Sequence, residues 1–189
     1  KENAELVPAD AGLINYLASH RHWTPFSHCR DSFEFGSRSI EDALDIMRFF
    51  TYTLTLEDKA SMVIKYIGNG VTVVRTSLFG WASILNRYSQ QDDEIGYRNH
   101  HQMAGVYNYL MAAYPLSTEK LFSAGTHLIF DQFAHSAEPY ITDADGDLMD
   151  ITLCEYVPIF IARQRFKHMV GTTYNEVSRR YVDTPPEFY

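Results

Sequence analysis

Residues 158–181 read PIFIARQRFKHMVGTTYNEVSRRY, and this stretch carries the most informative pattern of the chain. An apolar run from Pro158 to Ala162 leads into cationic side chains that stand on both sides of a polar segment, residues 172–176. The cationic residues are Arg163, Arg165, Lys167, Arg179 and Arg180, with His168 among them. Guanidinium and ammonium donors beside hydroxyl and amide groups suit a phosphorylated ligand. A solvated helix face with charges spaced i, i+4 explains the composition about equally well.

The stretch resembles the signature of flavin-dependent thymidylate synthases, R-H-R-x(n)-S followed by N-E-x-S-x-R-Y. Lys167-His168-Met169 stands where R-H-R is expected, and Thr172 or Thr173 stands where the Ser is expected. Residues 175–181 continue the match. A second block, HRHWTPFSH at residues 20–28, is similar to the family's H-G-H-x-(S/T)-P-F-E-H. Two separate blocks in the family's order are stronger support than one short motif.

The chain departs from the family pattern at identifiable positions. Lys167 keeps the positive charge of an Arg but loses its bidentate fork, and Met169 keeps neither property. Ser27 replaces the usual Glu, and one residue is inserted before Asn175. The resemblance covers residues 10–28 and 151–189 and leaves the long central stretch unexplained.

The resemblance implies a reaction and a set of ligands. The family methylates dUMP to dTMP with methylenetetrahydrofolate as carbon donor, FAD as hydride carrier and NADPH as reductant. Carried over position by position, the FAD-binding residues are His22, Thr24, Lys167, His168 and Glu176. The residues that bind dUMP are Gln164, Arg165, Lys167, Ser178, Arg179 and Arg180. The family's uracil-activating Arg is expected beyond Tyr189, so no catalytic residue is assigned.

The resemblance also implies a fold and an assembly. We expect an α+β fold in which a thymidylate synthase-complementing-like α/β core is split by a mostly helical insertion. Residues 1–28 and 151–189 would form the core and residues 29–150 the insertion, because His28 would join directly to Ile151 in the family pattern. Family members are homotetramers whose active sites combine several subunits. We expect this chain to be a fragment of a longer protein and to be inactive alone.

Hydrophobic periodicity gives the expected elements. The prediction is helices over 8–20, 40–50, 56–67, 97–114, 117–133 and 173–181, and a buried strand over 151–162. Residues 71–74 fit either a short strand or the start of a helix that continues through Leu85. Ser39 is a candidate cap for the helix that follows it, with Glu41 and Asp42 in the first turn.

Composition limits the class of protein. The 189 residues are 46% hydrophobic, enough for one domain with a sizeable core. The net charge of −8 argues against a nucleic-acid binder. Residues 151–189 carry five Lys or Arg and four Asp or Glu, whereas the rest of the chain carries 11 and 20. A basic pocket on an acidic body suits a small anionic ligand.

Two cysteines, Cys29 and Cys154, form no disulfide framework and are expected to be buried free thiols. The sequence shows no signal peptide and no apolar run of membrane length, which predicts a cytoplasmic protein without membrane contact.

Other patterns give weaker hypotheses. The pair His100-His101 lacks a third ligand at i+4, and the Gly of residues 143–147 stands at the wrong place for a calcium loop, so no metal site is predicted. One alternative function is a nucleotide- or flavin-binding homologue without synthase activity. Another is a helical interaction module in which residues 29–150 are the functional part.

Overall fold

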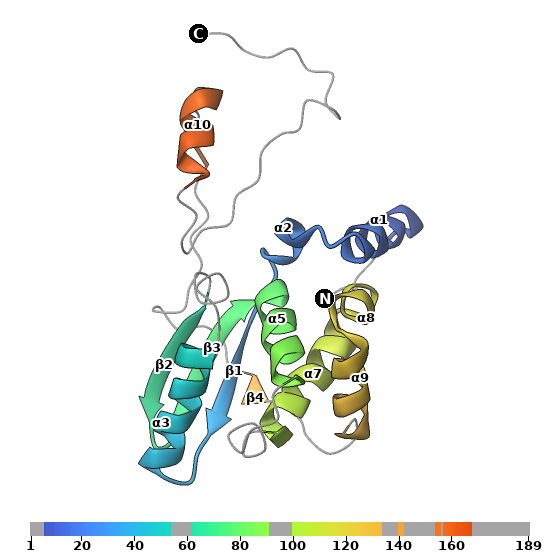
Figure 1. Cartoon of the computed structure of the whole chain (residues 1–189). Coiled ribbons are helices and arrows are strands. Elements are labelled where there is room, and N and C mark those ends of the chain that lie inside the picture. Colours follow the sequence, from blue (N-terminus) through green and yellow to red (C-terminus); the bar gives the residue numbers. More distant parts are fainter. Residues whose placement is uncertain are drawn as a thin grey trace.

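The computed structural model describes residues 6–53, 62–90, 100–133, 140–141, 154–155 and 157–167. Its centre is an antiparallel sheet with the strand order β2-β3-β1-β4. The strands are β1 (Arg30–Gly36), β2 (Val63–Gly68), β3 (Val71–Ser77) and the short β4 (Tyr140–Ile141). Figure 1 shows helices beside this sheet, so the chain combines helices and an antiparallel sheet as an α+β protein does.

The hairpin between β2 and β3 is specified by local sequence. Asn69 and Gly70 form its turn with φ values of 51° and 76°, a left-handed backbone that Asn and Gly adopt most readily. A Cβ atom at Gly70 would lie 2.6 Å from the backbone oxygen of Ser37, whose amide donates to the Gly70 carbonyl at 2.7 Å. Gly70 therefore also lets the end of β1 pack against the hairpin.

Register places one face of the sheet against the helices. Phe33 of β1 lies opposite Val74 of β3, and Phe35 lies opposite Thr72. All four side chains are buried. Trp81 of α5 (Leu78–Tyr88) packs edge-on against Phe33 with ring centroids 5.1 Å apart. The hydrophobic core thus lies between the sheet and α5.

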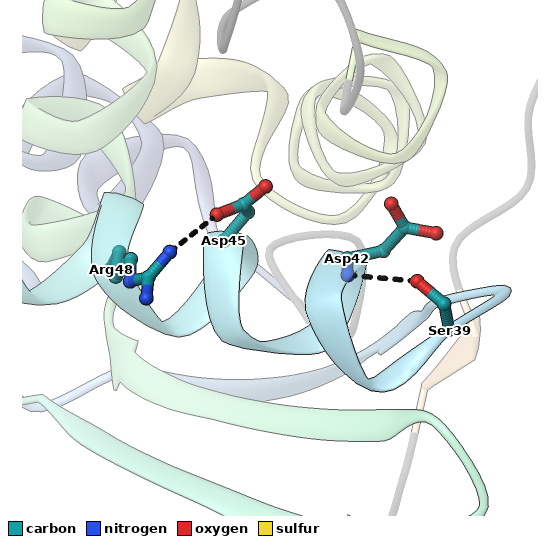
Figure 2. Close-up of polar contacts among 4 residues, drawn as sticks. All are labelled: Ser39, Asp42, Asp45 and Arg48. Carbon is teal, nitrogen blue, oxygen red and sulfur yellow. Dashed lines mark hydrogen bonds and ion pairs between the residues drawn. The ribbon is translucent and has the colours of Figure 1, made fainter.

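Helix α3 (Ile40–Arg48) begins at the predicted cap. The Ser39 hydroxyl accepts a hydrogen bond from the Asp42 amide at 3.1 Å, and Arg48 pairs with Asp45 at 3.0 Å (Figure 2). The chain continues into a π-helical turn, Phe49–Thr53, which buries Phe49 and Phe50. The cap fixes where α3 starts, and the two phenylalanines attach its end to the core.

The remaining helices are α7 (His100–Ala113), α8 (Pro115–Leu121), α9 (Ala124–Phe130), α1 (Pro8–Ser19), α2 (Trp23–Phe26) and α10 (Ile159–Arg165). Four of these helices, α2, α7, α8 and α9, contact α5, whereas α1 packs on α8 and α10 stands apart (Figure 1). Ala18 and Phe26 belong to the same core as the sheet residues. Residues 6–28 therefore share their packing with the segment 29–150, and the division into core and insertion stays a prediction.

Several predicted elements are confirmed. The helix expected over 8–20 is α1, the one over 40–50 contains α3, and the one over 97–114 contains α7. The helix expected over 117–133 is two helices, because Phe122 leaves the helical conformation and Ser123 caps α9 through the Thr126 amide.

Other predictions are wrong. Every described strand lies within residues 29–150, so the segment predicted to be mostly helical also holds the sheet, and the absence of strands expected there is wrong. Residues 63–67 belong to β2 rather than to a helix. Of the two conformations left open for residues 71–74, the strand is the one observed, and α5 begins after it. Residues 159–165 form α10 rather than a buried strand. Short apolar runs fit either conformation, and here the long-range pairing of strands decided it.

Two further observations concern the surface. Cys29 and Cys154 are exposed, so the prediction of buried thiols is wrong. Among the described helices, none combines the length and the apolar character needed to cross a bilayer. Residues 173–181, predicted to be helical, lie outside the described residues.

Candidate functional site

The N-terminal motif block forms a tight turn between α1 and α2. Arg21 has φ 55°, a left-handed conformation that is unfavourable for residues with a side chain. The His22 amide then donates to the Leu17 carbonyl at 2.9 Å. The family pattern has Gly at the position of Arg21, and the backbone explains that preference. A left-handed backbone at this position is by itself a physical reason for Gly in the pattern.

The turn gathers three exposed rings on one surface. The ring centroids of Tyr16 and His20 lie 4.1 Å apart, and the His22 ring lies 6.3 Å from Tyr16 and 6.4 Å from His20. The Nδ1 atom of His20 is 2.8 Å from the Tyr16 carbonyl oxygen. Since a carbonyl only accepts, Nδ1 carries the proton, and Nε2 of a neutral His20 has a free lone pair. The cluster offers flat rings and an imidazole acceptor to a ligand.

Helix α2 holds the second half of the block. Thr24 is half-buried, and the buried Ser27 donates to the Trp23 carbonyl at 3.1 Å. Trp23 packs on Phe79 of α5 with centroids 5.9 Å apart. Ser27 stands where the family has Glu, and its hydroxyl closes the helix internally. It therefore supplies no carboxylate to a ligand.

A buried polar cluster fastens α5 and α7 to the sheet. The Asp31 carboxylate, at the start of β1, accepts from the Tyr114 hydroxyl at 2.8 Å and from the Tyr109 hydroxyl at 3.5 Å. The Trp81 indole N–H donates to the Asp31 carbonyl at 3.1 Å. Burial, followed by the neighbouring Asp31 charge, raises the pKa of Tyr114. Sequence reasoning missed this cluster, because its members are far apart in the chain and follow no local motif.

The described part of the second motif block is α10 and the turn after it. Gln164, Arg165 and Lys167 are exposed, and Arg165 pairs with Glu155 at 2.8 Å. The apolar residues Ile159, Phe160 and Ile161 are exposed, and no residue of α10 is buried. In Figure 1, α10 stands apart from α2 and from the sheet. The described residues of the two blocks are therefore not brought together within one chain.

The other predicted site residues lie outside the described residues: His168, Glu176, Ser178, Arg179 and Arg180. One site made of both motif blocks requires Thr24 to approach His168, and an insertion over 29–150 requires Cys29 to lie near Asp150. Both expectations involve a residue outside the described ones. The described residues contain no group of three or more His, Cys, Asp or Glu side chains that could hold a metal ion. Residues 143–147 are also outside the described residues.

Comparison with known proteins gives one relevant similarity. The chain is 25% identical over 181 residues to a protein of Aquifex aeolicus (strain VF5) named flavin-dependent thymidylate synthase. The match covers 92% of this chain and 52% of that protein, so the chain spans about half the length of the relative. No protein-family profile matches the chain, and no solved structure matches it.

The extent of this match bears on residues 29–150. A match over 92% of the chain includes most of that segment as well as the block at residues 20–28 and α10. The segment therefore has a counterpart in the relative. This distant similarity is to one flavin-dependent thymidylate synthase and covers far more than the two motif blocks.

Proposed function

We propose that this chain is part of a flavin-dependent thymidylate synthase, which converts dUMP to dTMP with methylenetetrahydrofolate and NADPH. The observation that carries the proposal is the match to the Aquifex aeolicus protein across 92% of the chain. This match includes the turn at His20–His28 and the basic residues of α10, the two places where the sequence resembles the family. The proposal rests on the agreement between the overall match and the two motifs rather than on either motif alone.

The described residues fit a flavin in their chemistry. Tyr16, His20 and His22 present exposed rings near one another, which can stack on a flat heterocycle. Lys167 and Arg165 are exposed donors suited to phosphate oxygens. When bound, FAD supplies the hydride chemistry. The chain's own residues then bind the cofactor and the nucleotide and orient them toward each other.

The proposed site uses the residues named from the resemblance. His22 and Thr24 would contact FAD together with Lys167, His168 and Glu176. Gln164, Arg165, Lys167, Ser178, Arg179 and Arg180 would hold dUMP, with the last three on its phosphate. Exposed Ile159, Phe160 and Ile161 support a site that is completed between subunits, because an isolated seven-residue helix is not stable in water. A homotetramer is accordingly part of the proposal.

A second candidate is a flavin- or nucleotide-binding protein without synthase activity. Lys167 and Met169 favour it, because they replace two Arg side chains of the family signature. Loss of the bidentate fork weakens the recognition of phosphate and of a uracil carbonyl. The third reading, a helical interaction module, lost support because residues 29–150 contain the sheet and share the core with α1 and α2.

Flavin binding tests the proposal first. Titration of FAD with the purified protein, followed by flavin fluorescence, should show saturable binding. His22→Ala should weaken it, whereas His101→Ala, at an exposed histidine on α7, should not. Absence of saturable FAD binding by the parent protein would remove both flavin-dependent functions and favour the interaction module. Equal weakening by both substitutions would remove His22 from the site.

A further inference from the structure

A hydrogen-bonded cluster of Tyr107, His127 and Asp131 lies outside both motif blocks. The Tyr107 hydroxyl on α7 is 2.7 Å from Nδ1 of His127 and 2.7 Å from Oδ1 of Asp131. An ionised carboxylate only accepts, so the tyrosine donates its proton to Asp131. The remaining contact then requires His127 Nδ1–H to donate to the tyrosine oxygen. The order of donation is His127 to Tyr107 to Asp131.

The Tyr107 ring is the last of a row of aromatic side chains that contact one another through the core. Successive ring centroids along it are 6.3, 5.1, 5.6, 5.9 and 5.2 Å apart. In order, the rings of this row are those of Trp81, Phe50, Phe49, Tyr88, Phe130 and Tyr107, and all of them are buried. Trp81 lies at the end of the row next to the sheet, and Tyr107 lies at the end next to α9.

Indole and phenol rings are the side chains that lose one electron most readily, but a phenol must also release its proton. Tyr107 has only 1% of its surface exposed, so water cannot take that proton directly. Asp131 is already hydrogen-bonded to the hydroxyl, and its residue is exposed. Burial, with Asp131 adding to it, raises the pKa of Tyr107, so the resting phenol stays protonated.

We propose that Tyr107 is a redox-active tyrosine that takes an oxidising equivalent from Trp81 and passes its proton to Asp131. A one-electron oxidant, such as an oxygen-derived radical, first removes one electron from Trp81. The indole cation radical then gains an electron from Tyr107 through the ring chain, the O–H bond breaks, and the proton moves to Oδ1 of Asp131. The products are a neutral indole, a neutral phenoxyl radical and a protonated carboxyl group. His127 continues to donate to the phenoxyl oxygen.

A second tyrosine–carboxylate pair in the core, Tyr114 with Asp31, differs in one decisive respect. Asp31 is only 3% exposed, so a proton accepted there stays inside the protein. Asp131 is exposed and can pass the proton to water. The oxidising equivalent therefore ends at the buried Tyr107, whose partner Asp131 reaches the protein surface, and this transfer does not depend on thymidylate synthase activity.

The test uses a photosensitiser attached to the full chain. In a Cys154→Ser background, the exposed Cys29 is labelled with a ruthenium polypyridyl complex, which becomes a one-electron oxidant after a light flash with a quencher. Transient absorption should show an indole radical that converts to a phenoxyl radical. Tyr107→Phe, which keeps the ring, should lose the phenoxyl signal. The control Tyr66→Phe, at a partly exposed residue of β2, should retain it.

A second variant tests the proton acceptor. Asp131→Asn changes an exposed residue and keeps the shape of the side chain. The phenoxyl radical should form more slowly in this variant, because an amide cannot take the proton. Circular dichroism of each variant establishes that it is folded. A phenoxyl signal that persists in Tyr107→Phe would overturn the assignment to Tyr107. An unchanged rate of phenoxyl formation in Asp131→Asn would overturn the role of the carboxylate. This rate can be measured even if Tyr107→Phe does not fold.

Discussion

Replacing Asn86 by alanine should destabilise the fold far more than an average substitution at a half-buried site. Asn86, on α5, donates through Nδ2 to the Leu121 carbonyl at 3.0 Å. Its Oδ1 accepts from the Ser123 amide at 2.7 Å and from the Thr126 hydroxyl at 2.6 Å. One side chain thereby joins α5 to the break between α8 and α9.

The magnitude follows from these three hydrogen bonds. Each contributes about 1 kcal/mol net, and an unsatisfied backbone group costs more, so Asn86→Ala should lower the free energy of unfolding by about 2–4 kcal/mol. The site is half-buried, and access of water to the Leu121 and Ser123 backbone keeps the loss within that range. Gln132→Ala is a matched amide control, because Gln132 is exposed and its side chain donates only to the Leu128 carbonyl one turn earlier in the chain.

Urea unfolding followed by tryptophan fluorescence measures both variants, with the urea dependence (m value) compared to confirm the same transition. Gln132→Ala should change the free energy of unfolding by less than about 0.5 kcal/mol. A loss for Asn86→Ala no larger than that of the control would refute the view that this amide connects the three helices.

Four other outcomes are expected. Arg21→Gly should stabilise the fold by up to about 1 kcal/mol, because it relieves the left-handed backbone at φ 55°; a lower thermal midpoint would contradict this. Ser39→Ala should cost about 1 kcal/mol through the lost helix cap, measured by urea unfolding, and no change would show that water replaces the cap. Burial raises the pKa of Tyr107 and Tyr114 in the folded state, whereas the unfolded tyrosines ionise near pH 10. The stability that these two tyrosines contribute is therefore complete below about pH 10 and is lost as the pH rises further. Urea denaturation at a series of pH values across pH 10 should show this loss, and the loss should be smaller in Tyr114→Phe. Arg180→Ala should weaken dUMP binding by about 1.5–3 kcal/mol in calorimetry without loss of flavin, and unchanged affinity would remove Arg180 from the phosphate site.

Sequence predicted the elements whose signals are local. Ser39 with its acidic first turn marked the start of α3, and Pro8 with spaced apolar residues marked α1. Strand β2 was missed, because Val63 to Ile67 continued an apolar pattern that also fits a helix. Only its pairing with β3, which is specified by the Asn69-Gly70 turn, settled its conformation.

The contacts of the candidate site are also of two kinds, those set by local sequence and those made between distant segments. His22 ends the turn after α1 and Thr24 lies on α2, so the two are close because they are close in sequence. Other contacts join segments that are distant in the chain, such as Asp31 with Tyr114 and Tyr107 with His127. No spacing in the sequence predicts them. Such contacts depend on how α7 packs on the sheet, which is a property of the whole fold.

Methyl transfer to dUMP is the proposed reaction, and tritium release from the substrate measures it. Tritium release from dUMP labelled at carbon 5 reports replacement of that hydrogen. The complete protein should be incubated with FAD, NADPH and methylenetetrahydrofolate. We expect tritium release that requires all three additions and that falls when Arg180 is replaced by alanine. Saturable FAD binding without tritium release would contradict synthase activity and leave a flavin-binding homologue in its place.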